Sequence, residues 1–133
     1  MSKENVEVVR EAFDAALRGD WAVASAAFDP SVEWVEMPSL GPDASTYHGI
    51  EELRGAIQSW LGNWGEYAAD VARYADSGDD VVILIRERAQ GGVSGAAVER
   101  ELGEVVTLRE AKIVRVRLYG DWAEALGAAG LSE

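Results

Sequence analysis

The sequence predicts an α+β fold, because its helical and strand-like patterns occupy separate stretches of the chain. Apolar residues recur at helical spacing over 6–17 and again over 50–64. After Gly65 the period changes from 3.6 to 2, and four strand-like segments follow one another with short turns between them. Helices and strands that are segregated in this way are typical of the α+β class.

The first part of the chain is expected to form two helices and a strand. The helix over 6–17 should end near Gly19, because a left-handed residue suits a helix C-terminus. Asp20 can cap a short second helix from Trp21 to Phe28. The stretch VEWVEMP, residues 32–38, is then expected to be a strand whose side chains alternate between two faces.

The rest of the chain is expected to form a loop, a helix, a strand meander and a last helix. Glycine, proline and polar residues predict a loop over 39–49, and one broad apolar stripe predicts a helix from Ile50 to Trp64. Asp121 resembles the first residue of a capping box that opens a short helix from Trp122 to Ala129. The meander has a glycine-rich hairpin loop at 89–96, and its four strands are expected over 66–76, 81–88, 97–109 and 113–119.

Composition and charge limit the classes of protein to which the chain can belong. A length of 133 residues, 48% of them hydrophobic, suits one globular domain over 1–133. The net charge of −12 argues against nucleic acid and against an anionic membrane surface, because both require clustered Lys and Arg. No apolar run approaches the roughly 20 residues that cross a bilayer, and the polar N-terminus does not resemble a secretory signal. The absence of cysteine removes disulfides and thiolate metal sites, and it is compatible with a cytoplasmic location.

The strand expected over 81–88 points to a second subunit. Residues 81–85 are apolar at every position, so both faces of this strand should be covered. One face would meet the helices, and no further element is expected over the other. This pattern favours a homodimer through the open sheet face over scattered surface hydrophobics, and an isologous interface would let acids on one subunit meet arginines on the other. Residues expected on this face are Ile83, Ile85, Glu87, Val105, Arg109, Arg115, Arg117 and Tyr119.

Alternation also selects the residues that should face the helices. Arg86 and Glu104 are charged members of that set, so they form either a structural ion pair or a functional pair in a wet cavity. Trp60 and Trp64 belong either to the core or to an aromatic-lined pocket. The other members that alternation places on the helix-facing side are Val82, Leu84, Arg88, Leu102, Val106, Leu108, Val114, Val116 and Leu118.

Two further motifs carry little chemistry. His48 is the only histidine, which argues against a histidine metal cluster and against a Ser-His-Asp triad. It lies near the start of the third helix, where a capping role is expected. The glycines of QGGVSG lack the Lys-Ser/Thr ending of a phosphate loop and precede a strand, which indicates a hairpin. No metal or organic cofactor is therefore expected.

Two runs of the sequence resemble one known family. They are RGDW…FDPSVEWVEMP…YHGIEELR and VTLREAKIVRVRLYGDWAEALGAAG. They resemble the SnoaL-like polyketide cyclase branch of the nuclear transport factor 2-like superfamily, whose fold ketosteroid isomerases and limonene epoxide hydrolase share. The resemblance covers nearly the whole chain. It implies a cone in which a strongly curved mixed sheet wraps the long third helix, with a pocket between them. On this fold the strand face that carries Val32, Trp34 and Glu36 would look into the pocket. The fold hosts several chemistries and also non-enzymes.

The resemblance also implies roles for individual residues. Trp34 and Glu36 match the positions where epoxide hydrolases of this fold hold the attacking water, and Arg86 matches the arginine of their catalytic trio. Arg88 and Leu118 stand where those enzymes have aspartates. These two departures argue against epoxide hydrolysis by that mechanism.

The residues and the resemblance together predict a small-molecule pocket. Glu104 falls where the isomerases have an oxyanion-hole aspartate, and Leu118 replaces the acid on which the polyketide cyclases rely. We expect a protein that binds a small hydrophobic or amphipathic molecule, as an isomerase, cyclase or hydrolase. Glu36, beside an indole and poorly solvated, would act as general base, while Glu104 and Arg86 would orient the substrate or stabilise an oxyanion. The alternative is a non-catalytic binding or dimerisation module whose charged residues only pair with one another.

Overall fold

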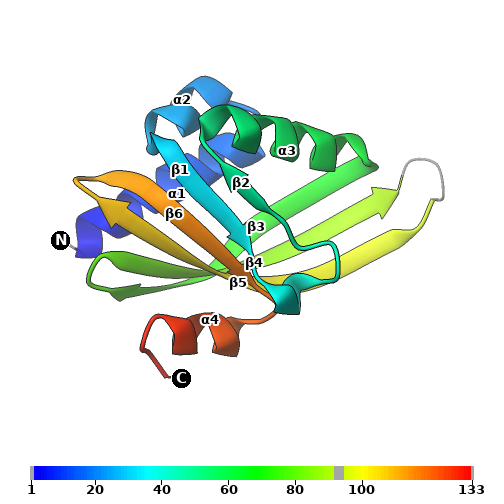
Figure 1. Cartoon of the computed structure of the whole chain (residues 1–133). Helices are drawn as coiled ribbons and strands as arrows, with labels where there is room; N and C mark the ends of the chain where they lie inside the picture. The colour runs from blue at the N-terminus through cyan, green and yellow to red at the C-terminus, as the bar shows by residue number, and fades with distance from the viewer. Residues whose placement is uncertain (1, 92–94, 133) are drawn as a thin grey trace.

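The computed structural model describes residues 2–91 and 95–132, and it confirms the α+β class (Figure 1). One curved, mixed sheet has the strand order β2-β1-β6-β5-β4-β3, with β1 parallel to β6 and the other neighbours antiparallel. The helices are α1 (Ser2–Leu17), α2 (Trp21–Ala26), α3 (Ile50–Gly62) and α4 (Trp122–Ala128), with a 3₁₀ turn η1 (Pro38–Leu40). The strands are β1 (Phe28–Glu36), β2 (Thr46–His48), β3 (Trp64–Ser77), β4 (Asp80–Gly91), β5 (Ala97–Arg109) and β6 (Lys112–Tyr119).

Capping residues set the helix ends that the sequence predicted. Asp20 accepts a hydrogen bond from the N–H of Val23 at 3.3 Å and so caps α2. Asp121 caps α4 in the same way through the N–H of Glu124, at 2.8 Å. Gly19, just beyond α1, has a φ of 83°, which is the left-handed conformation expected there.

Three boundaries differ from the prediction near the first strand, and the strand expected over 32–38 is itself β1, Phe28–Glu36. The loop predicted over 39–49 contains β2, a short strand that exists because it pairs with β1 rather than through an apolar pattern of its own. The helix predicted over 21–28 ends at Ala26 instead. It stops early because Phe28 already belongs to β1, where it pairs with Ile113 of β6.

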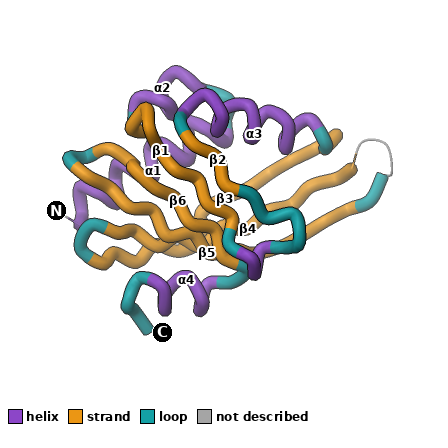
Figure 2. Tube along the Cα trace, viewed as in Figure 1, coloured by secondary structure: helices purple, strands orange, loops and turns teal. Residues whose placement is uncertain are grey.

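The long strands β3, β4 and β5 form an arm that extends beyond the other strands, with α3 above it (Figure 2). Within the arm, β4 runs into the predicted 89–96 loop as far as Gly91, and β5 begins at Ala97. Residues 92–94 of that predicted loop lie outside the described residues. The arm carries one end of the sheet face that α3 covers.

Helices cover both faces of the sheet. We call the face that α1 and α3 cover the inner face, and the opposite face, against which α4 packs, the outer face (Figure 1). The expectation that no element of the chain covers the outer face is therefore wrong for the part beneath α4. Buried side chains there come from the sheet and from the helix, namely Val82, Leu84, Val105, Tyr119, Trp122, Ala125 and Leu126.

The alternation along β4 is opposite to the prediction. Val81, Ile83 and Ile85 belong to the inner core, whereas Val82 and Leu84 pack with α4 on the outer face. All five are buried, since helices cover both faces of this strand. A run that is apolar at every position does not show which of its residues face which side of the sheet. An error of one residue then moves every side chain to the other face.

This change of phase moves several predicted site residues. Arg86 and Arg88 share the outer face with Leu84, so the predicted inner placement of all three is wrong. Arg86 pairs there with Glu101, with 2.6 Å between Nε and Oε2, and not with Glu104. Glu87, predicted for the outer face, lines the inner cavity instead.

The strand β6 follows the predicted phase only in its second half. Val116 and Leu118 belong to the inner core, as expected. A register shift in the β5–β6 pairing places Ile113 in the same core. Val114, predicted for the inner face, borders a hollow on the outer face instead.

A glycine in β5 allows α4 to lie close to the sheet. A Cβ added at Gly103 would lie 2.6 Å from the Cβ of Ala125 and 2.6 Å from the backbone oxygen of Asp121. Real side chains do not approach so closely, and the Asp121 oxygen belongs to the capped first turn of α4. The helix would have to move to admit even one methyl group.

We predict that Gly103→Ala lowers the free energy of unfolding by about 1–3 kcal/mol, because the added methyl overpacks the α4 contact. Urea denaturation followed by tryptophan fluorescence measures the change. Gly55→Ala in α3 is the matched control: a Cβ there meets nothing within 4 Å. That variant should be more stable by roughly 0.5–1 kcal/mol, because alanine favours a helix interior. Equal stabilities for Gly103→Ala and the wild type would contradict the described docking of α4.

Candidate functional site

A cavity of about 570 Å³ lies between the inner face of the sheet, α1 and α3. Its volume lies within the range of small-molecule sites in proteins. Most of its wall is apolar, and the apolar and aromatic residues that line it include Phe13, Trp21, Trp34, Ile57, Trp60 and Leu118. The cavity is therefore the candidate functional site.

Glu104 is the most deeply buried acid of the cavity wall. Its residue surface is 4% exposed, and its Oε1 atom has no hydrogen-bond partner within the described part of the chain. β5 brings it to the inner face because Leu102 and Val106, two positions away on either side, both belong to the inner core. A buried carboxyl group without a partner is costly, so this group calls for a functional explanation.

A network of three polar side chains lies on the arm beside Glu104. Arg100 of β5 donates from Nε to one carboxylate oxygen of Glu87, and the hydroxyl of Tyr67 donates to the other. The Arg100 guanidinium also lies over the ring of Trp60, 5.3 Å from its centroid. Trp60 itself packs edge-on against Trp64, with ring centroids 5.5 Å apart. Glu87 thus joins three strands through its two oxygens.

The electrostatic surroundings favour a protonated Glu104. Burial, and then the charge of Glu87, raise the pKa of Glu104 to about 8, although the charge of Arg100 acts in the opposite direction. Burial and the hydrogen bond to Glu87 also raise the pKa of Tyr67, so its phenol stays neutral. At pH 7 the cavity therefore holds a neutral carboxylic acid next to an ion pair.

Glu36 is the second carboxylate on this wall. In the sheet register it lies level with Leu118, which lies level with Glu104, so the two acids are on the same row with one strand between them. Their Cα atoms are therefore about 10 Å apart, which is two strand spacings. Glu36 accepts a hydrogen bond from the N–H of Ser45 at 3.0 Å. A small molecule that lies over Leu118 could reach both carboxyl groups.

The structure brings only part of the predicted set of site residues together. Leu84, Arg86 and Arg88 lie on the outer face, as described above. Val106 and Val116 are fully buried in the inner core rather than in the cavity wall. Trp64 contacts Trp60 but is not part of that wall. The predicted residues that line the cavity are Trp34, Glu36, Trp60, Glu104 and Leu118.

Sequence reasoning missed Tyr67, Glu87 and Arg100. Arg100 could have been found, because it lies two residues before Leu102 and so shares the face of Leu102 and Glu104. Glu87 could not be placed without the phase of β4. In β3, polar and apolar residues mix on both faces, and bulges interrupt the pairing, so Tyr67 gave no clear signal either.

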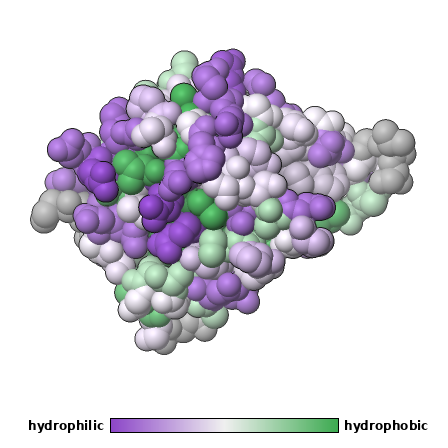
Figure 3. Space-filling view, in the orientation of Figure 1, coloured by the Kyte–Doolittle hydropathy of each residue, from purple (hydrophilic) through white to green (hydrophobic). Residues whose placement is uncertain are grey.

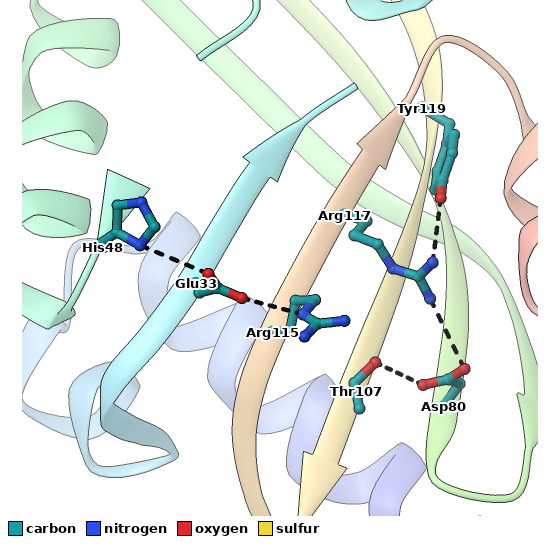
Figure 4. Close-up of polar contacts among 7 residues, drawn as sticks. All are labelled: Glu33, His48, Asp80, Thr107, Arg115, Arg117 and Tyr119. Atoms are coloured by element: carbon teal, nitrogen blue, oxygen red, sulfur yellow. Dashed lines mark hydrogen bonds and ion pairs between the residues drawn. The ribbon is translucent and has the colours of Figure 1, made fainter. Parts of the chain in front are cut away.

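A second hollow, of about 690 Å³, lies on the outer face beside β1, β5 and β6. Figure 4 shows Glu33 between His48 and Arg115, with nitrogen–oxygen distances of 3.6 and 3.3 Å. In the same view Arg117 contacts the Tyr119 hydroxyl and Asp80. In Figure 3 hydrophilic residues gather mainly over the left and upper parts of the view, with hydrophobic areas among and below them. This hollow lacks the apolar wall and the buried acid of the inner cavity.

Within residues 2–91 and 95–132, no group of three or more His, Asp or Glu residues is gathered in an arrangement that could hold a metal ion. None of the helices described is long and apolar enough to span a membrane.

Comparison with known proteins identifies the family. The SnoaL-like domain matches residues 9–116, and no curated protein matches the chain. A nuclear transport factor 2-like protein of unknown function from Burkholderia pseudomallei is 26% identical, with a TM-score of 0.78 over 96% of this chain and 97% of that protein. TerC, co-crystallised with polyporic acid, is 18% identical, with a TM-score of 0.77 over 89% and 92%. A protein of ketosteroid isomerase-like fold from Catenulispora acidiphila, in complex with trimethylamine, is 16% identical, with a TM-score of 0.73 over 94% and 93%. Since the domain match spans most of the chain, from α1 to β6, this protein belongs to the SnoaL-like domain family.

Proposed function

We propose that this protein binds a small, largely apolar molecule in the inner cavity, and that Glu104 makes the polar contact with it. One observation carries the proposal: Glu104 is buried in an apolar cavity, and its Oε1 has no hydrogen-bond partner within the described residues. Leaving such a group unsatisfied costs roughly 1–3 kcal/mol. A ligand with a complementary polar group would recover that cost on binding.

The similar structures support a small organic ligand but not its identity. TerC was co-crystallised with polyporic acid, and the Catenulispora acidiphila protein was solved with trimethylamine. At 18% and 16% identity the likeness to these proteins extends to the fold and carries no conclusion about the ligand or the activity. The ligand class has to be argued from the side chains of the cavity itself.

In its catalytic form the proposal gives the two carboxyl groups different roles. Glu36 acts as the general base, which takes a proton from the substrate or from water, and Glu104 orients the substrate. Their separation of about 10 Å, two strand spacings, leaves room for a substrate between them. Isomerisation, cyclisation and hydrolysis are the reaction types that such a base can serve. Arg100 is paired with Glu87, so its charge does not pair with Glu36.

A second candidate function is binding without catalysis. The observation that favours it is the closed network of Tyr67, Glu87 and Arg100, in which each charge already has its partner. Leu118 also separates Glu36 from Glu104 with an inert side chain. In this form the cavity stores or carries a ligand, and Glu36 has no chemical role.

We predict that Glu36→Gln lowers turnover of any substrate found by screening by roughly 10²–10⁴-fold, because glutamine keeps the shape and removes the base. Steady-state kinetics and ligand titration measure turnover and affinity separately. Glu33→Gln is the control, since Glu33 lies on the same strand but on the outer face, where it pairs with Arg115. If Glu36→Gln binds and turns over substrate as the wild type does, Glu36 is not the base.

The protonated state of Glu104 predicts a dependence of stability on pH. The folded protein holds this proton up to about pH 8, whereas the unfolded chain releases it near its ordinary pKa of 4.5. Between these values the folded state binds more protons, so its stability falls as the pH rises, by up to about 1.4 kcal/mol per pH unit. Glu104→Gln should remove this slope from urea denaturation measured between pH 5 and 8. Glu101→Gln, on the outer face of the same strand, should keep it. A slope that survives in Glu104→Gln would mean that another group causes it.

We also propose that two copies of the chain pair through the part of the outer face that α4 leaves open. This area carries both signs of charge, because Arg115 and Arg117 lie beside Glu33 and Asp80. A two-fold arrangement would set arginines of one copy against acids of the other.

Light scattering at micromolar concentration should therefore give twice the chain mass of 14.3 kDa. Val35→Lys should yield monomers, because it adds a positive charge next to Arg117, the β6 residue with which Val35 is in register. Gln58→Lys, at an exposed position of α3, is the matched control and should leave the dimer intact. A monomeric wild type would rule out this assembly.

A further inference from the structure

The charges around the inner cavity do not balance. Four acids contribute to its wall, Glu36, Asp43, Glu87 and Glu104, and Arg100 is the only basic residue among the described lining residues. Arg100 is already paired with Glu87 and lies over Trp60. No basic side chain in the described wall therefore remains for the other three acids.

The aromatic residues of the wall suit a positively charged guest. Trp21, Trp34 and Tyr47 line the same cavity as the acids. The faces of such rings attract organic cations, most strongly where water is excluded. Arg100 over Trp60 is an example of this attraction within the protein itself.

The net charge of the cluster formed by Glu87, Arg100 and Glu104 indicates which charge a ligand should carry. Glu87 and Arg100 cancel each other, so a protonated Glu104 leaves the cluster neutral. An anionic ligand would add an unpaired charge to it, at a high desolvation cost. An ammonium group carries hydrogen-bond donors and no acceptors, which is what a carboxylate oxygen without a donor requires. If Glu104 gives up its proton as the ammonium enters, the cluster stays neutral and Oε1 gains its partner.

We infer that the ligand of the inner cavity is a small apolar amine, bound as its ammonium ion against the Glu104 carboxylate and the aromatic wall. This inference rests on the proposed function, because it takes the inner cavity as the ligand site and names the ligand class. The empty cavity keeps the proton on Glu104, and the bound cation replaces it. One proton therefore passes from Glu104 to the solvent for each ammonium bound, and no covalent bond forms or breaks in the ligand.

The groups that face Glu104 define the pH range of this exchange. Glu87 comes from β4, Arg100 from β5 and Tyr67 from β3, while Glu36 of β1 lies on the same row two strands away. The described cavity residues of α1 and α3 carry no titratable group, and Asp43 lies exposed in the loop before β2. Because Glu104 loses its proton only near pH 8, amine affinity should rise up to tenfold per pH unit from pH 6 to 8.

Three probes of similar shape and different charge test the inference: benzylamine, benzyl alcohol and benzoate. Isothermal titration calorimetry at pH 6, 7 and 8, in buffers of different ionisation enthalpy, gives both the affinity and the protons released. We expect benzylamine at pH 8 to bind at least tenfold more tightly than benzyl alcohol, with benzoate weakest. At pH 7 close to one proton should be released per benzylamine bound.

Matched variants assign the effect to Glu104. Glu104→Gln should abolish proton release and weaken benzylamine at least tenfold, and it should leave benzyl alcohol within about twofold, because the neutral amide keeps the shape of the acid. Glu101→Gln, on the opposite face of β5, should behave as the wild type in every titration. If Glu104→Gln does not fold, the proton count and the pH profile of the wild type decide the question alone.

The outcomes separate the inference from the function on which it rests. Tightest binding of benzyl alcohol or benzoate, or an amine affinity that does not change with pH, would overturn the amine class but leave small-molecule binding intact. Loss of benzylamine binding in Glu36→Gln but not in Glu104→Gln would overturn the assignment to Glu104. Absence of binding for all three probes at millimolar concentration would count against the inner cavity as a ligand site, and so against the proposed function as well.

Discussion

The ion pair between Glu87 and Arg100 is the interaction on which the rest of the site depends. Glu87 is 9% exposed, so its charge could not remain in the cavity without a close partner. The pair occupies the only basic residue in the described wall and anchors Tyr67. Burial, and then the negative charge of Glu87, raise the pKa of Glu104 so that it keeps its proton at pH 7. A fully satisfied pair and a neighbouring unsatisfied acid are thus two parts of one electrostatic arrangement.

The arrangement requires a sheet that is covered on both sides. Gly103 and Glu104 are consecutive in β5 and therefore point in opposite directions, one toward α4 and the other into the cavity. The close approach of α4 fixes the strand from outside, while the inner core fixes it from within. The depth at which Glu104 is buried is consequently set by packing on the face that does not touch a ligand. The outer face contributes to the site through rigidity rather than through contacts.

Much of the fold was predictable because local signals agreed with tertiary packing. Polar residues at Asp20 and Asp121 and a glycine after α1 marked helix ends that packing did not override. The inner placement of Glu104 followed from alternation along its strand. The inner placement of Trp34 and Glu36 came from the resemblance to the family, because each face of the stretch 32–38 carries one acid among apolar residues. Alternation could not place the side chains of β4. Because α4 buries the face that would be polar in an open sheet, polar and apolar residues do not alternate along this strand. That error of one residue in β4 placed Arg86 in the predicted site and left Glu87 out of it. The ion pair between Glu87 and Arg100 was therefore not predicted either. The short strand β2 was missed for a different reason, since it owes its conformation to its partner β1.

The three-way contact at Glu87 restricts how this cavity can change in evolution. Its two oxygens bridge β3, β4 and β5, so the group that holds the arm together is also part of the binding surface. Any substitution that alters the charge at Glu87 must be met by a compensating change at Arg100 in the same lineage. Trp34, Ile57 and Leu118 line the same wall with uncharged side chains, so a change of size at one of them alters the shape of the cavity and leaves its charge unchanged. New ligand shapes are therefore accessible by single steps, whereas a new ligand charge requires paired steps.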